Sequence, residues 1–212
     1  MVIDILSSEF CYREIAEDIT NSIMLLKEAN IKNFENYSEW VYDVPISEEH
    51  AEYINWTMNI ARSRDLEADY DIIGSAGRDE NDEPSLSITI VLPSNVHQNK
   101  VKIKYAELFD VVAHELHHIA QNIDNNEYPR STNEKGKLSY LLDPFEIEAF
   151  HIGIRAQSML TGNDFEAIAR DYIERSCKHL EITKEDVTRV ITAWKNTDFP
   201  AFRQNTGEFN NV

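Results

Sequence analysis

The sequence is poor in cysteine and has no long apolar run, and both absences narrow the class of protein. Its 212 residues include only two cysteines, Cys11 and Cys177, and neither belongs to a CxxC metal motif. We therefore expect two buried thiols in a reducing compartment rather than a disulfide. The chain has no stretch of about 18 apolar residues, and MVIDILSSEF lacks the basic start of a signal peptide. A cytoplasmic protein without a membrane partner is expected.

Basic residues are also scarce, with 20 Lys and Arg against 38 Asp and Glu and a formal net charge of -18. Such a surface repels phosphate backbones, so we expect no nucleic acid partner. It favours basic peptides or proteins as partners instead. The hydrophobic content of 42% over 212 residues is sufficient for one folded domain, 1–212, with its own core.

Apolar spacing predicts helices in both outer parts of the chain. Residues 1–65 are expected to form N-terminal helices, one beginning near Ser7 or Ser8 and another over about 48–64. Residues 123–200 are expected to hold a long loop (123–142), a helix begun by Asp143 and Pro144, and two C-terminal helices, about 164–178 and 184–196. Thr183 with Asp186 predicts a capping box for the last helix. The tail, 201–212, has little pattern.

The middle region, 66–122, changes from strand to helix. Residues 70–78 and 86–93 have the composition and alternation of strands, and a turn-rich segment joins them. Residues 105–122 then have apolar residues at helical spacing. The fold class predicted is α+β, mostly helical, with a small antiparallel or mixed sheet before the central helix.

The central helix carries the segment VVAHELHHIAQ, 111–121, which contains the motif HExxH. Positions i and i+4 of a helix share one face, so His114 and His118 can bind the same metal ion. Glu115 is offset from the ligand position and can accept a proton from a metal-activated water as general base. His117 is interpreted as an accessory or structural residue.

A third ligand must come from another segment, because a catalytic zinc usually has three protein ligands and one open position. The helix after Asp143 offers Glu146, Glu148 and His151. Glu146 has a competing interpretation, since at the third helical position it can close a capping box with Asp143. Glu146 and Glu148 lie about 200° apart round the helix, so both cannot serve equally. Asp143 is interpreted as the cap.

An oxyanion donor is also needed for acyl chemistry, and three residues qualify by their chemical type. They are Tyr140, His151 and Arg130. His151 is also a candidate core histidine, Tyr140 a candidate packed aromatic and Arg130 a candidate surface charge.

HExxH followed by Glu146-Ile147-Glu148-Ala149, an E-x-x-A setting, resembles the gluzincin branch of the zincin metallopeptidases. The resemblance covers residues 111–150 and implies a zinc-dependent peptide hydrolase with Glu146 as third ligand. It also implies that strand 86–92 lies along an extended substrate. An aspartate that often follows E-x-x-A in relatives is replaced by Phe150, and Asp124 stands where HExxHxxGxxH proteins have a third histidine. The compact, acidic form also resembles metallopeptidases encoded by phages.

Zinc is the expected cofactor because two imidazoles lead the ligand set. The expected function is peptide-bond hydrolysis by a metal-activated water, with Glu115 as base. One alternative is a catalytically inactive zincin-fold protein with a binding or structural role. Another is a di-iron helical bundle, because Glu115-x-x-His118 and Glu148-x-x-His151 are both E-x-x-H motifs.

Overall fold

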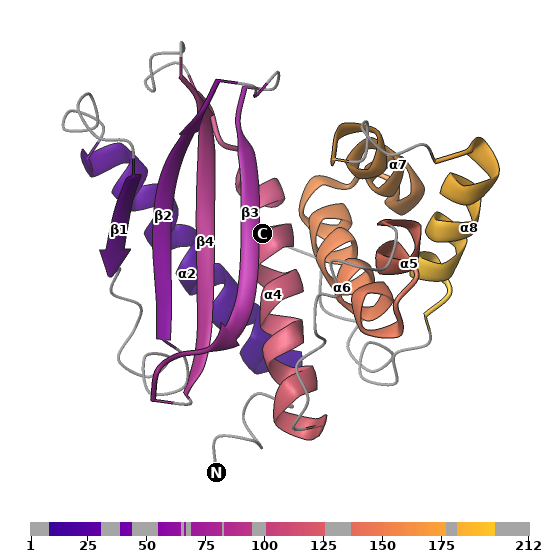
Figure 1. Cartoon of the computed structure of the whole chain (residues 1–212), viewed down its shortest axis with the longest axis horizontal. Helices are drawn as coiled ribbons and strands as arrows, with labels where there is room; N and C mark the ends of the chain where they lie inside the picture. Colours follow the sequence, from indigo (N-terminus) through magenta and orange to yellow (C-terminus); the bar gives the residue numbers. More distant parts are fainter. Residues whose placement is uncertain are drawn as a thin grey trace.

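The computed structural model describes residues 9–30, 39–43, 55–64, 66, 69–81, 83–94, 101–125, 137–176 and 182–197 (Figure 1). The elements, in chain order, are α2 (Glu9–Asn30), β1 (Glu39–Asp43), β2 (Asn55–Ser63), β3 (Asp71–Arg78), β4 (Pro84–Pro93), α4 (Tyr105–Asn125), α5 (Lys137–Leu141), α6 (Pro144–Thr161), α7 (Phe165–Ser176) and α8 (Lys184–Lys195). A mostly helical α+β class, with a sheet before the central helix, is confirmed. No helix in these ranges is long and apolar enough to cross a membrane.

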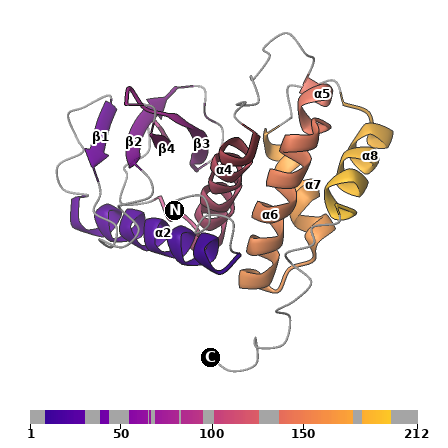
Figure 2. The ribbon, with the colours of Figure 1, turned by 90° about the horizontal axis from the view of Figure 1, so that it is seen from below.

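The four strands form a mixed sheet in the order β1-β2-β4-β3. β2 and β4 are parallel, whereas β1 pairs with β2 and β3 pairs with β4 in antiparallel fashion. β4 therefore lies inside the sheet, and the expectation that strand 86–92 borders a substrate is wrong. The strand that ends the sheet beside α4 is β3, and its outer edge has no partner among the described strands (Figures 1 and 2).

The prediction of a helix over 48–64 is wrong for its second half, because Asn55–Ser63 is strand β2. Trp56, Met58 and Ile60 are buried and alternate with less buried residues. Burial at every second residue is typical of a strand, but Met58 and Ala61 are also spaced as on one face of a helix. Pairing with both β1 and β4 favours the strand. Residues 48–54 lie outside the described ranges.

Two hydrophobic cores divide the molecule. The first joins α2, the sheet and α4, and the second joins α5, α6, α7 and α8. Figure 2 shows α2 beneath the sheet, with α4 between β3 and α6. The contact between α4 and α6 is among the most extensive between any two described elements. The boundary between the cores is therefore formed by the two helices that carry the candidate ligands.

Several helix predictions agree with the structure. α2, α4, α6, α7 and α8 lie where helices were expected, and both hydrogen bonds of the Thr183–Asp186 capping box are present. Within the expected loop 123–142, α4 extends to Asn125 and residues 137–141 form α5. Residues 1–8, 126–136 and 198–212 lie outside the described ranges, so the predictions for Ser7, Ser8, Arg130 and the tail are not tested.

Candidate metal centre

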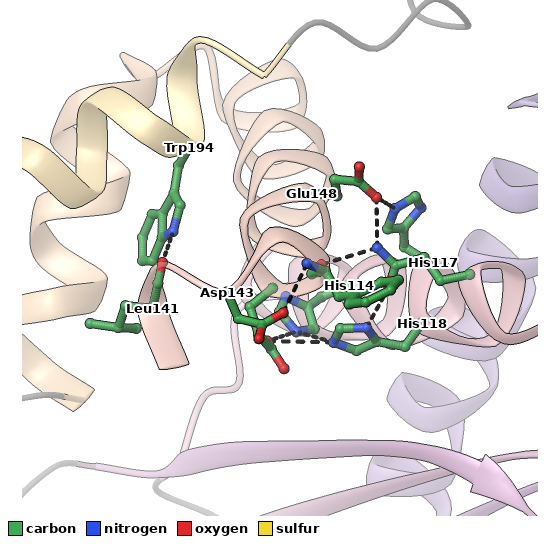
Figure 3. Close-up of polar contacts among 10 residues, drawn as sticks. His114, His117, His118, Leu141, Asp143, Glu148 and Trp194 are labelled. Atoms are coloured by element: carbon green, nitrogen blue, oxygen red, sulfur yellow. Dashed lines mark hydrogen bonds and ion pairs between the residues drawn. The ribbon is translucent and has the colours of Figure 1, made fainter. Parts of the chain in front are cut away.

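α4 presents the HExxH motif on a helix whose apolar side chains are buried in the first core. Leu108, Val112, Leu116 and Ile119 are at most 1% exposed. The histidines lie on a different face of α4 but are also buried, with His114 at 8% and His118 at 7%. Their Nε2 atoms are 3.1 Å apart (Figure 3), as the i, i+4 spacing predicts.

Glu146 from α6 completes a triangle of donor atoms. Its Oε2 atom lies 3.5 Å from the Nε2 atom of His114 and 3.5 Å from that of His118. Metal–ligand bonds of about 2.0–2.2 Å in a tetrahedral site place neighbouring donor atoms about 3.3–3.6 Å apart. The three side chains, all buried, therefore have close to the spacing needed to hold one metal ion.

The capping role considered for Glu146 is already filled by other groups. The Asp143 carboxylate accepts a hydrogen bond from the backbone N–H of Phe145 at 3.1 Å. The backbone N–H of Asp143, which a capping-box glutamate would bind, donates to the carbonyl of Tyr140 at 3.0 Å. The Oε2 atom of Glu146 is buried and accepts no hydrogen bond. Such an atom, directed at two imidazoles, fits a metal ligand.

The charges of these side chains favour a cation between the donor atoms. Burial acts to raise the pKa of Glu146, but His114 and His118 outweigh it and lower this pKa to about 2. For His118, burial acts to lower the pKa, and Glu146 together with Gln121 outweighs burial and raises it. A cation at the centre would be stabilised by the Glu146 carboxylate and, once His118 is neutral, by the lone pair on its Nε2 atom.

Glu115 lies against β3 and near enough to the three candidate ligands to interact electrostatically with them. Burial raises the pKa of its carboxyl, an effect that His114 and His118 partly offset, and the backbone N–H of Ala76 donates a hydrogen bond to it. A Cβ atom on Gly74 would lie only 2.6 Å from Glu115 Oε1, so this glycine makes room for the carboxylate. Gly74 was not among the residues predicted for the site, although a glycine inside a strand often marks a close approach.

A second polar group lies behind the ligands and includes Glu148, which is therefore not the third ligand of the triangle. Glu148 Oε2 lies 3.5 Å from His117 Nε2 and accepts a hydrogen bond of 2.8 Å from the Gln121 amide (Figure 3). The same amide bonds His118 Nδ1 through its oxygen, at 2.8 Å. Gln121 was also missed, and its signal was the i+3 spacing from His118.

His151 is not brought to the candidate metal centre. It is 5% exposed, and its Nδ1 donates a 2.7 Å hydrogen bond to the carbonyl of Trp194 on α8. It lies about 140° from Glu146 round α6. The two E-x-x-H motifs of the di-iron alternative therefore do not converge, because Glu148 turns to His117 and His151 to Trp194.

Tyr140, in contrast, lies beside the centre. Tyr140 belongs to α5. This helix is held against α8 by a 2.9 Å hydrogen bond, which the indole N–H of Trp194 donates to the carbonyl of Leu141 (Figure 3). The Tyr140 residue is 41% exposed, yet burial of its hydroxyl and the carboxylate of Glu146 raise the pKa of that hydroxyl. Tyr140 therefore keeps its proton at the rim of the centre.

The comparisons with known proteins return no match among family models, curated proteins or solved structures. The assignment of a candidate metal centre therefore comes from the side chains of α4 and α6. A buried His114, His118 and Glu146 group, carried by a helix that follows a small mixed sheet, is consistent with a zincin-like motif.

Proposed function

We propose that this protein hydrolyses peptide bonds with a zinc ion held by His114, His118 and Glu146. The observation that carries the proposal is the triangle of Nε2, Nε2 and Oε2 atoms, with sides of 3.1, 3.5 and 3.5 Å. Two neutral imidazoles and one carboxylate are a donor set that suits zinc, and three protein ligands leave a position open for water.

Zinc bound at this group would lower the pKa of a water molecule toward neutrality and polarise the substrate carbonyl. Glu115 accepts a proton from the attacking water as the new carbon–oxygen bond forms, and delivers it to the nitrogen when the carbon–nitrogen bond breaks. The raised pKa of its carboxyl suits this shuttle. The protonated hydroxyl of Tyr140 donates a hydrogen bond to the oxyanion.

The proposed substrate is an extended peptide or protein segment, with basic sequences favoured. The outer edge of β3 lies beside α4, and an extended chain can add to such an edge through backbone hydrogen bonds. The formal net charge of -18 favours association with positively charged segments.

The test is to measure zinc content and peptide hydrolysis for the wild type, Glu115→Gln and Glu146→Gln. Glu115→Gln should keep one zinc per chain and lose at least about 100-fold in kcat, because it loses only its base. Glu146→Gln should lose most of its zinc. Glu166→Gln, at an exposed residue of α7, is the matched control and should change neither measurement.

The substrates should be peptide libraries that include both basic and acidic members, with faster cleavage expected for the basic ones. If wild type and Glu115→Gln both hold zinc and the wild type cleaves nothing, the hydrolase proposal fails. That result would favour the alternative of a metal-binding protein with a structural or binding role.

A further inference from the structure

We propose that Gln121 is a positioning residue that prepares His118 to bind the metal by fixing its tautomer. This inference rests on the metal-binding half of the proposed function and not on hydrolysis. Gln121 is 6% exposed and lies one turn beyond His118 on α4. Its amide contacts His118 on one side and α6 on the other.

The orientation of the Gln121 amide is set by its two partners on α6. Its Nε2 donates to Glu148 Oε2 at 2.8 Å and to the backbone carbonyl of Phe145 at 3.1 Å. Both partners are acceptors, so a rotated amide would place its own oxygen against two other oxygens. The amide nitrogen therefore stays toward α6, and the amide oxygen is directed at His118.

The orientation of the amide determines which nitrogen of His118 carries the proton. Gln121 Oε1 lies 2.8 Å from His118 Nδ1, and an amide oxygen can only accept a hydrogen bond. Nδ1 therefore carries the hydrogen, and Nε2 keeps its lone pair. Nε2 is the atom that lies 3.5 Å from Glu146 Oε2, so the lone pair is at the candidate metal position.

The same hydrogen bonds hold the two ligand-bearing helices in register. Phe145 and Glu148 flank Glu146 on α6, and Gln121 binds them both from α4. Phe150 on α6 packs its ring against His114, with 4.6 Å between the ring centroids. Gln121 on α4 thus gives the candidate centre a polar contact behind His118.

The first measurement is zinc affinity by chelator competition in the full chain. Gln121→Leu should weaken zinc binding by about 10- to 100-fold, the usual effect of losing a partner behind a ligand. Glu148→Gln alone should keep most of the affinity, because its amide oxygen still accepts from Gln121. The double variant Gln121→Glu with Glu148→Gln should recover part of the loss. Glu at 121 accepts from His118 and from Gln at 148, but its second contact is lost because the carbonyl of Phe145 cannot donate to it.

The second measurement is the tautomer of His118 in the metal-free protein, by nitrogen-15 NMR at a pH where the ring is neutral. The wild type and the double variant should carry the hydrogen on Nδ1, whereas Gln121→Leu should shift it toward Nε2. Loss of the fold would also move this signal, because it breaks the hydrogen bond at Nδ1, so each variant must first show the wild-type urea unfolding transition. Gln121→Leu with wild-type affinity overturns the inference, and so does weakened affinity with an unchanged tautomer.

These outcomes are distinct from failure of the proposed function. If the wild type binds no zinc, the metal centre itself is wrong. If the wild type binds zinc and cleaves nothing, the hydrolase proposal fails while the tautomer measurement still decides the role of Gln121.

Discussion

At the scale of single residues, Gly74 and Glu115 depend on each other. β3 passes so close to α4 that an added Cβ on Gly74 would lie 2.6 Å from Glu115 Oε1 and 2.8 Å from its Cδ. Gly74→Ala should therefore displace the carboxylate and reduce kcat/KM for peptide hydrolysis by at least about 10-fold, in line with the size of a general-base contribution. Zinc affinity should stay nearly unchanged, because the clash is with Glu115 and not with a ligand.

Gly77→Ala is the matched control on the same strand. A Cβ there would meet only Ser85 Oγ at 3.9 Å, an ordinary contact. Steady-state kinetics and chelator competition on both variants separate the two positions. Equal activity of Gly74→Ala and Gly77→Ala would mean that Glu115 does not need its present place beside β3.

At the scale of elements, the crossing of α4 and α6 has a carboxyl group, that of Asp110, at a point of close approach. A Cβ on Gly153 of α6 would lie 2.8 Å from the backbone oxygen of Asp110 on α4, so the glycine permits this crossing. Burial raises the pKa of Asp110 to about 7; Glu107 adds to the shift and Arg175 opposes it. The interface therefore favours the protonated form of Asp110.

The sign of the pH dependence follows from this raised pKa. Folding favours protonated Asp110, so its contribution to stability is full below about pH 4 and is lost as the pH rises through about 7. Asp110→Asn mimics the protonated form and should raise the free energy of unfolding at pH 8 by up to about 4 kcal/mol, from about 3 pKa units at about 1.4 kcal/mol each. The difference should vanish near pH 4. Urea unfolding of the metal-free protein at both pH values measures it, and a constant difference would contradict this account.

The elements also show which parts of the fold could be predicted from sequence. α4, α6 and α8 depend on local signals, such as helical spacing, the Asp143 cap and the Thr183 capping box. β2 depends on pairing with β1 and β4, one of them distant in sequence, and was predicted as a helix. The position of β4 inside the sheet likewise follows from its pairing with both β2 and β3.

The candidate centre likewise has a part that could be predicted from the sequence and a part that could not. His114 and His118 lie on one helix, so their convergence could be predicted from spacing. Glu146 had two possible roles in the sequence, and the cap role is ruled out by a contact that the sequence does not reveal, the hydrogen bond from the backbone N–H of Asp143 to the carbonyl of Tyr140. The roles of Gln121 and Gly74 depend on how closely α6 and β3 approach α4, and no local pattern specifies those distances.

At the scale of the whole molecule, zinc would join the two hydrophobic cores. α4 contributes to the first core and α6 to the second, and the donor atoms lie between them. Zinc at about 1,000 times its Kd adds about 4 kcal/mol to the stability of the state that binds it. For a chain of this size, that corresponds to a rise in Tm of about 8–16 °C.

Calorimetry with zinc and with a chelator measures this rise. Glu146→Gln should show a much smaller one, because only the two histidines of α4 remain. Equal shifts in wild type and Glu146→Gln would place the bound zinc elsewhere in the molecule.

The origin of the candidate ligands on two helices also has a consequence for how the protein would acquire a metal ion. His114 and His118 come together as soon as α4 forms, but Glu146 arrives only when α6 docks against it. Closing the intervening segment costs chain entropy, so a nascent or unfolded chain offers only a weak two-imidazole chelate. Metal binding would then be a late step of folding, and newly made chains would compete poorly for scarce metal ions until both helices are in place.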